Sequence, residues 1–210
     1  MAKNIAIIDY NVGNLLNVAN ACEYLGTKAQ LISSPDAIGK ADYLILPGVG
    51  SSQEGMKGLQ QYFFIEAIRE YCRSGKGLLG ICLGMQLLAD SSDEGGTRPT
   101  LGLIPGRVTA IPSTNHLGQR VVIPNINWLN VRATRDKSPL IPLLQDNRFY
   151  FVHSYQFSDT ADDNIVATTS HQGITINAMV QKDNVIGCQF HPEKSSHAGL
   201  NLLRYFINNF

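Results

Sequence analysis

The sequence predicts an α/β fold with a central, mostly parallel sheet flanked by helices, and with antiparallel strands added in the C-terminal half. Two observations predict it. In roughly the first 90 residues, short apolar runs alternate with stretches of helical periodicity, a pattern typical of parallel sheets covered by helices. From Arg107 onward, strand-like runs are separated only by turn residues, which favours antiparallel additions.

The expected elements of the first half follow one another closely. A helix begins after Asn14, interpreted as its N-cap, and ends at Gly26; a second, short helix opens at Ser34-Pro35. Apolar runs ending in turn or glycine residues are typical of buried parallel strands. The expected strands are 5–8, 29–32, 43–46 and 78–81, and a further helix is expected over 60–72.

The second half is expected to be richer in strands. A polar loop covers 90–100, and an amphipathic helix over 197–209 closes the chain. Strand-like runs lie at 107–111, 120–123, 148–152, 165–169, 174–180 and 185–190, with hairpin turns at 115–118, 171–173 and 182–184.

Composition excludes several classes of protein. The 210 residues are 44% hydrophobic and 16% charged, which is typical of a globular chain, and we expect one domain over 1–210. The formal net charge is +0 without runs of like charge, so no nucleic-acid partner is expected. Without a signal peptide or an apolar run of membrane length, we expect a cytoplasmic protein and no membrane partner. The four cysteines are scattered, so neither a metal nor another cofactor is expected.

Cys82 stands where a strand is expected to turn sharply into a helix. Gly80 and Gly84 flank it, as glycines do where the backbone must pass without Cβ collisions. The Gly-x-Ser-x-Gly nucleophile elbow has the same logic, and the positive end of a helix favours a thiolate. The alternative is a buried structural cysteine in a βα turn, since free cysteine is often buried.

His191 and Glu193 follow the expected strand 185–190. Ligands of open α/β sheets bind beyond the carboxyl ends of strands, where Cys82 is also expected. A cysteine nucleophile needs a base and a group that orients the base, and two residues separated by Pro192 in an extended segment could supply both. The alternative is a structural histidine at a strand end. The remaining histidines 116, 171 and 197 are interpreted as solvated.

Pro47-Gly48-Val49-Gly50 forms a glycine-rich segment after the third expected strand. It lacks the spacing of a dinucleotide or Walker motif, so a phosphate site is not indicated. Backbone that can turn its N–H groups toward a developing oxyanion is what acyl transfer requires. The segment could also be only a tight connection.

These motifs together resemble the class I triad glutamine amidotransferases, and within them the glutaminase subunits of imidazole glycerol phosphate synthase. The matching segments span nearly the whole chain in the order of that family. They are Ile8-Asp9-Tyr10, Gly13-Asn14-Leu15, Leu46-Pro47-Gly48-Val49-Gly50, Gly80-Ile81-Cys82-Leu83-Gly84-Met85-Gln86, Gly102-Leu103-Ile104-Pro105-Gly106, Tyr150-Phe151-Val152-His153-Ser154-Tyr155 and Gln189-Phe190-His191-Pro192-Glu193-Lys194-Ser195.

The resemblance implies hydrolysis of glutamine through a cysteine thioester. Cys82 would attack the carboxamide, His191 would protonate the departing ammonia and then activate water, and Glu193 would orient His191. The oxyanion would be held by backbone N–H groups, and further residues would surround the glutamine. The oxyanion residues would be Val49, Gly50 and Leu83, and the substrate-binding residues Gly50, Gln86, Glu94, His153, Ser154 and Tyr155.

The resemblance also implies a heterodimer in which ammonia passes to a (β/α)8-barrel synthase, which makes imidazole glycerol phosphate in histidine biosynthesis. Asn14, Trp128 and Lys194 match positions on the partner face, although a helix cap and an exposed lysine remain alternatives for Asn14 and Lys194. Asn11 replaces a common glycine, and 124–129 departs from the usual Pro-His-Met-Gly-Trp-Asn.

Those departures leave the partner open. One alternative is a paralogous subunit that feeds ammonia to a related synthase for amidino sugars of surface polysaccharide. A second is a stand-alone cysteine hydrolase of the same fold. A non-catalytic binding module would usually have lost a member of the triad, and here all three are present.

Overall fold

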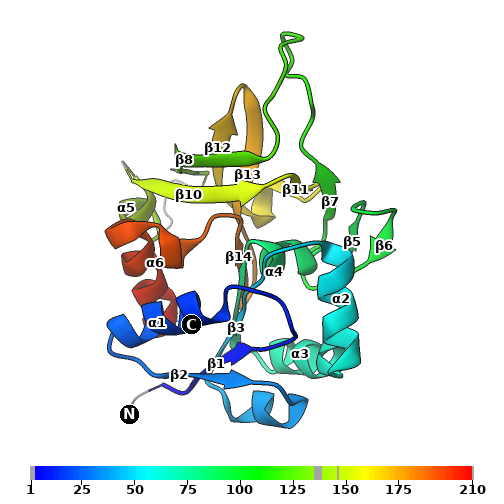
Figure 1. Ribbon diagram of the computed structural model, residues 1–210. Coiled ribbons are helices and arrows are strands. Elements are labelled where there is room, and N and C mark those ends of the chain that lie inside the picture. The colour runs from blue at the N-terminus through cyan, green and yellow to red at the C-terminus, as the bar shows by residue number, and fades with distance from the viewer. Residues whose placement is uncertain (1–2, 135–138, 146, 210) are drawn as a thin grey trace.

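An eight-stranded sheet forms the centre of the computed structural model, which describes residues 3–134, 139–145 and 147–209. Five neighbouring strands are parallel, and three antiparallel strands extend the sheet at one side (Figure 1). In spatial order they are β2 (Ala29–Ile32), β1 (Ile5–Ile8), β3 (Tyr43–Leu46), β4 (Gly77–Ile81), β14 (Val185–Cys188), β13 (Ile174–Lys182), β12 (Ile165–His171) and β9 (Arg132–Ala133). The predicted fold class is confirmed.

Both faces of the parallel strands are covered by helices. Ile5 and Ile7 of β1 belong to a core formed with α1 (Leu15–Tyr24) and α6 (Ser196–Asn209), whereas Ile8 belongs to the core on the other face. The second core includes residues of η1 (Pro35–Lys40), α2 (Ser52–Gln61), α3 (Phe64–Arg73) and α4 (Leu83–Leu87). Because both faces are covered, these strands are almost entirely apolar.

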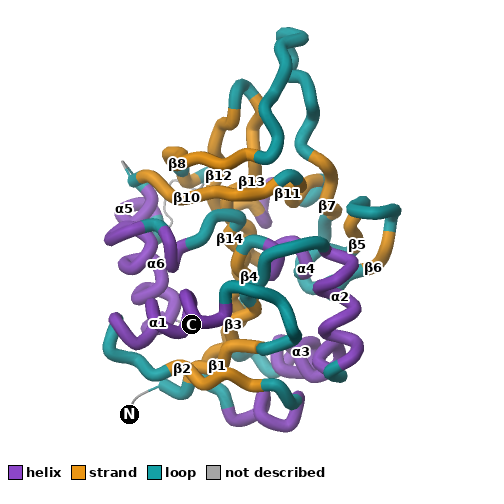
Figure 2. Tube along the Cα trace, in the orientation of Figure 1, coloured by secondary structure: helices purple, strands orange, loops and turns teal. Residues whose placement is uncertain are grey.

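Two smaller sheets lie beside the central one, one next to β12 and β13 and the other on the side of α2 and α4 (Figure 2). β8 (Asn125–Asn130) pairs antiparallel with β10 (Arg148–His153), and α5 (Ile141–Leu144) lies between them in the chain. A four-stranded sheet contains β11 (Tyr155–Ser158), β7 (Arg107–Ala110), β5 (Ser91–Ser92) and β6 (Arg98–Pro99). η2 (Asp162–Asn164) precedes β12, and η3 (Pro192–Lys194) precedes α6.

Several predicted boundaries were wrong. The single helix expected over 60–72 is interrupted because Phe63 adopts φ +60°, which ends α2 and starts α3. The beginning of α2 was missed, although the Ser51 side chain caps it by accepting a hydrogen bond from the Glu54 N–H. The strand expected over 120–123 is absent, with only an isolated bridge between Thr114 and Arg120.

Polar strands were also missed. β5 and β6 lie within the segment expected to be a loop, and β8 and β11 were not foreseen. The run 185–190 was expected among the antiparallel additions, which was wrong: β14 pairs in parallel with β4, and it ends at Cys188 rather than at residue 190. In the part of the chain that the structure describes, no helix has the length and apolar character to cross a membrane.

Candidate active site

Cys82 occupies the sharp turn between β4 and α4. Its backbone has φ +53° and ψ −107°, a strained conformation for a residue with a side chain. A Cβ at Gly80 would lie 2.8 Å from the backbone of Gly84, and a Cβ at Gly84 would collide with the Leu46 carbonyl of β3. Both glycines are therefore required by packing, and the predicted strand-to-helix turn is confirmed.

His191 and Glu193 form a buried pair beside this turn. The His191 Nδ1 lies 2.7 Å from the Glu193 Oε1, and neither side chain is exposed to solvent. The contact is made by η3 rather than by the extended segment that the sequence predicted, because Pro192–Lys194 is a 3-10 turn. With Nδ1–H donating to the carboxylate, Nε2 is left without a hydrogen-bond partner among the described residues.

Burial and two neighbouring groups determine the pKa of His191. Burial opposes protonation of the ring, but the interactions with Cys82 and Glu193 outweigh it and raise the pKa of His191 to about 9. The imidazole is therefore a strong candidate to hold a proton near the sulfur at neutral pH.

Asn14 is a further member of this cluster. Its Nδ2 donates to the Glu193 Oε1 at 2.6 Å and lies 3.3 Å from the His191 Nδ1. Asn14 stands at the predicted N-cap of α1, but its φ is +82° and its side chain makes no capping bond. The N-cap position is confirmed, but the side chain does not cap the backbone, because its Nδ2 donates to Glu193 and its Oδ1 accepts from the Asn17 side chain.

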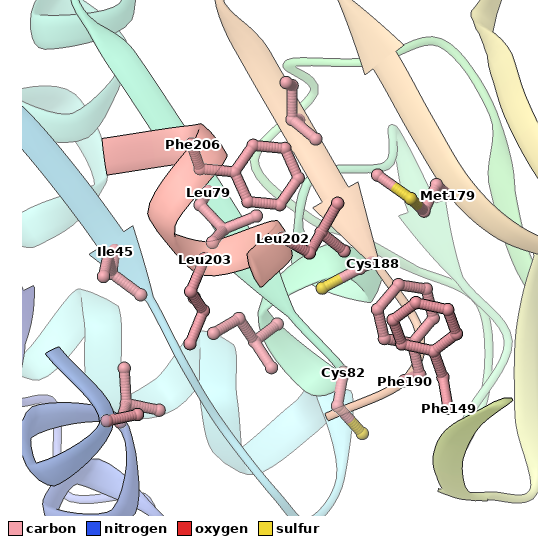
Figure 3. Close-up of a cluster of buried hydrophobic side chains, with 14 of the residues drawn as sticks. Ile45, Leu79, Cys82, Phe149, Met179, Cys188, Phe190, Leu202, Leu203 and Phe206 are labelled. Carbon is pink, nitrogen blue, oxygen red and sulfur yellow. The ribbon is translucent and has the colours of Figure 1, made fainter. Parts of the chain in front are cut away.

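The sulfur of Cys82 lies at the edge of the apolar core (Figure 3). Cys82 is 6% exposed, and its Sγ lies 3.9 Å from the Val152 carbonyl oxygen and 3.7 Å from the Gln189 Nε2. The other three cysteines are also buried, and burial raises the pKa of Cys22 to about 11, that of Cys72 to about 12, and that of Cys188 well above its usual value. These three thiols are poor nucleophiles.

A cavity of about 280 Å³ opens beside Cys82. The predicted oxyanion and substrate-binding residues all line it, together with two that the sequence had not indicated, Pro124 and Val152. The full lining is Val49, Gly50, Cys82, Leu83, Gln86, Glu94, Pro124, Val152, His153, Ser154 and Tyr155. Within the described residues, no group of three or more His, Cys, Asp or Glu side chains could hold a metal ion.

Hydrogen bonds fix the polar side chains around the cavity. The Gln86 Nε2 donates to the Tyr155 carbonyl and to the Gln189 Oε1, both at 3.0 Å. The Glu94 Oε2 accepts the Ser52 backbone N–H at 2.6 Å, which ties the loop after β5 to the start of α2. Sequence reasoning missed Gln189 and Ser52, although Gln189 is only two residues before His191.

His153 belongs to a chain of buried amides and imidazoles. Its Nδ1 lies 2.7 Å from the Tyr155 carbonyl oxygen, and its Nε2 lies 2.9 Å from the Asn125 Nδ2. Asn127 links Asn125 to His171, which is 2% exposed and lies 2.8 Å from the Val122 carbonyl. The interpretation of His171 as solvated was therefore wrong, because 120–123 and β8 cover it.

The Leu83 N–H is engaged in this structure. It donates to the Gly48 carbonyl at 3.3 Å, and the neighbouring Pro47 carbonyl accepts from the Tyr10 hydroxyl at 2.6 Å. Val49 lines the cavity and is partly exposed. The arrangement does not leave the Leu83 N–H pointing freely toward a ligand.

Two of the predicted partner-face residues are exposed. Trp128 on β8 is 40% exposed and packs against Tyr150, with ring centroids 5.8 Å apart. Lys194 follows Glu193 at the surface, whereas Asn14 turns its amide inward to Glu193.

A strained cysteine beside a buried histidine–glutamate pair is the arrangement expected of a cysteine-dependent acyl-transfer enzyme, and the comparisons with known proteins give the family. Residues 6–209 match the profile of the family described as glutamine amidotransferase class-I. The chain belongs to this family, and it is an enzyme, a glutamine amidotransferase.

Similar proteins within this family indicate a particular kind of subunit. The chain is 42% identical to imidazole glycerol phosphate synthase subunit HisH 1 of Legionella pneumophila strain Lens, covering 98% of this chain and 99% of that protein. It is 41% identical to the HisH subunit of Halalkalibacterium halodurans, covering 96% and 94%. It resembles the solved structure of PurLQS from Thermotoga maritima with a TM-score of 0.75 at 19% identity, covering 99% of each chain, which bears on the fold alone.

Proposed function

We propose that this enzyme hydrolyses glutamine to glutamate and ammonia through Cys82, His191 and Glu193, and delivers the ammonia to a (β/α)8-barrel synthase that makes imidazole glycerol phosphate in histidine biosynthesis. The observation that carries the chemistry is the strained Cys82 elbow, which sets the sulfur beside the buried His191–Glu193 pair and at the cavity. The names of the relatives support the pathway. We further propose that 1–210 is one domain acting in the cytoplasm.

The reaction has two halves. The Cys82 thiolate attacks the carboxamide carbon, and the His191 Nε2–H gives its proton to the departing nitrogen, so that ammonia leaves and a γ-glutamyl thioester remains. His191, now neutral, takes a proton from water as the water attacks the thioester, and glutamate leaves as the sulfur is released. Glu193 holds Nδ1–H, which keeps Nε2 directed to the reacting atoms.

The cavity offers a complementary group for each end of glutamine. The Glu94 carboxylate supplies negative charge for the α-ammonium group, and its position is fixed by the Ser52 N–H. Gln86 uses both hydrogens of its Nε2 within the protein, so its Oε1 is the atom that can accept from the substrate. Gly50, His153, Ser154 and Tyr155 complete the enclosure.

The oxyanion donors are proposed to form only after the 47–50 segment reorients. The Leu83 N–H is bonded to the Gly48 carbonyl, so breaking this bond frees the donor that would hold the oxyanion together with the N–H groups of Val49 and Gly50. Removing one such donor from other enzymes costs about 100- to 1000-fold in rate. We therefore expect the isolated chain to hydrolyse glutamine slowly, and a liganded partner to accelerate it.

The sequence of β8 supports a second candidate for the partner protein. Asn125 and Asn127, which replace histidine and glycine of the usual family pattern, belong to the hydrogen-bonded chain that reaches His153 and His171. Substitutions integrated in this way on the strand that carries exposed Trp128 are compatible with a changed partner, such as the related synthase for amidino sugars. The triad chemistry is common to both candidates.

The test is release of glutamate from glutamine by the purified chain, alone and with the barrel synthase and its nucleotide substrate, with Cys82→Ala as control. Strong stimulation, abolished in Cys82→Ala, supports the proposal as stated. Activity without stimulation by this synthase, but with stimulation by the amidino-sugar synthase, replaces the histidine pathway. Full activity of the isolated chain contradicts partner-dependent formation of the oxyanion site and supports a stand-alone hydrolase.

A further inference from the structure

Gln189 is a buried amide in contact with the sulfur of Cys82. It follows β14 and precedes His191 by two residues, and its side chain and backbone are 0% exposed. Its backbone N–H donates to the Ala178 carbonyl of β13 at 2.9 Å, so its position does not depend on a bound ligand. A buried amide of this kind is retained only where its donors and acceptors are used.

The direction of the Gln189 amide follows from its neighbours. The Tyr155 backbone carbonyl can only accept a hydrogen bond, so the Gln86 atom 3.0 Å from it must be nitrogen. The same nitrogen meets the Gln189 side chain at 3.0 Å, so that contact must be the Gln189 oxygen. The Gln189 Nε2 is then the atom that lies 3.7 Å from the Cys82 Sγ.

We infer that Gln189 donates an N–H to the Cys82 sulfur and favours its thiolate form. This inference rests on the proposed role of Cys82 as nucleophile. A hydrogen bond to an ionised acceptor is stronger than one to its neutral form, so the donor stabilises the anion more than the thiol. The Val152 carbonyl, 3.9 Å from Sγ on another strand, can accept from the thiol but repels the thiolate.

The same chain of amides links substrate binding to the sulfur. A substrate that donates to the Gln86 Oε1 polarises the Gln86 amide, and this strengthens the donor that Gln86 presents to the Gln189 Oε1. The Gln189 amide in turn becomes a better donor to Sγ. Gln189 thereby acts on the nucleophile without entering the cavity lining.

Among the described residues, His191, Tyr10 and Cys188 interact electrostatically with Cys82, and the titratable groups Glu94, His153 and Tyr155 line the same cavity. Burial raises the pKa of both Tyr10 and Cys188 well above their usual values, so neither supplies a charge at neutral pH. His191 is the charged partner of the sulfur, and Glu193 acts through it. Gln189 provides an uncharged donor that is present at every pH.

Gln189→Met is the deciding variant because it removes both polar atoms at similar volume and adds neither a charge nor a donor beside the sulfur. Gln189→Glu is the companion variant: it keeps an oxygen for the Gln86 Nε2 but replaces the amide donor with a carboxyl group, which repels the thiolate when ionised. Gln30→Glu, on exposed β2, controls for the added charge. Each protein is alkylated with iodoacetamide from pH 5 to 10, and mass spectrometry follows the peptide that contains Cys82.

In both Gln189 variants the midpoint of the Cys82 alkylation profile is expected to lie about one pH unit higher than in the wild type and in Gln30→Glu, so that alkylation is about tenfold slower at pH values below the wild-type midpoint. Their kcat for glutamine falls more than KM rises. A lower melting temperature with an unshifted alkylation profile shows a purely structural role and overturns the inference. If the variants shift the alkylation profile but the wild-type protein releases no glutamate from glutamine, the proposed function is refuted and the assignment of Gln189 stays in place.

Discussion

Replacement of His153 by glutamine should remove a large part of the acid sensitivity of this enzyme. The pKa of His153 is lowered to about 4, mainly by burial and to a smaller extent by the neighbouring His171 and His191, against the opposing effect of the hydrogen bond to the Tyr155 carbonyl. The hydrogen bonds explain the preference for the neutral ring. Nδ1–H donates to the Tyr155 carbonyl and Nε2 accepts from Asn125, whose own oxygen accepts from Asn127.

The sign and size follow from linkage. An unfolded chain binds a proton at this histidine below about pH 6.5, whereas the folded chain does so only below about pH 4. The contribution of neutral His153 to the free energy of unfolding is therefore fully present above pH 6.5, and it is lost as the pH falls from 6.5 to 4. A difference of about 2.5 units corresponds to about 3 kcal/mol, since one unit is about 1.4 kcal/mol.

Urea unfolding at pH 7.5 and 4.5 measures this effect. His153→Gln can still donate to Tyr155 and accept from Asn125, so the wild type should lose about 2–3 kcal/mol more than this variant between the two pH values. Titration of carboxylates affects both proteins and cancels in the comparison. The exposed His116→Gln serves as control and should behave as the wild type does. Parallel losses in wild type and His153→Gln would refute the reasoning.

Three further substitutions test the candidate site. Burial disfavours the charged form of His191, but Cys82 and Glu193 outweigh it and raise the pKa of His191 to about 9. Cys82→Ala should therefore lower this pKa by more than one unit in an NMR titration. A pKa still near 9 in the variant would exclude Cys82 as a cause. Glu193→Gln should reduce kcat about a hundredfold or more while KM changes little, because His191 loses its orienting charge; an unchanged kcat would count against the triad. Gly84→Ala should cost at least about 2–3 kcal/mol in urea unfolding, because its Cβ meets the Leu46 carbonyl, whereas Gly39→Ala, where the Cβ meets nothing within 4 Å, should not.

The parallel core could be predicted because its strands are continuous apolar runs. The proximity of Cys82 and His191 could be predicted because each follows an apolar strand. β14 pairs with β4 in parallel, with Cys188 opposite Ile81, so the residues that follow both strands emerge at one edge of the sheet. The sequence indicated that both residues follow strands, but the parallel pairing of β14 with β4 is a finding of the structure.

The polar strands and the amide network could not be predicted. β8 carries asparagines, which local propensity assigns to turns; Asn125 is buried and pairs with His153, and the more exposed Asn127 pairs with Asn125 and His171. The β-branched segment 120–123 looked like a strand, yet Val122 is 62% exposed and its N–H is bonded by the Gln172 side chain. In both cases tertiary pairing overrides the local pattern.

The contact between Gln189 and the Cys82 sulfur could not be predicted from the sequence either. Nothing in its immediate context distinguishes it from a residue that merely ends a strand, and its function depends on the Gln86 amide and on the direction imposed by the Tyr155 carbonyl. Contacts between residues 69 and 103 positions apart in the chain set that direction.

Covalent labelling by a diazo-ketone analogue of glutamine, followed by peptide mass spectrometry, tests the central claim most directly. The chain contains four buried cysteines, and the account predicts a single adduct on Cys82, prevented by excess glutamine and strongly slowed in His191→Asn. An adduct on Cys22, Cys72 or Cys188, or labelling that glutamine does not prevent, would contradict the assignment of Cys82 as the nucleophile that attacks glutamine.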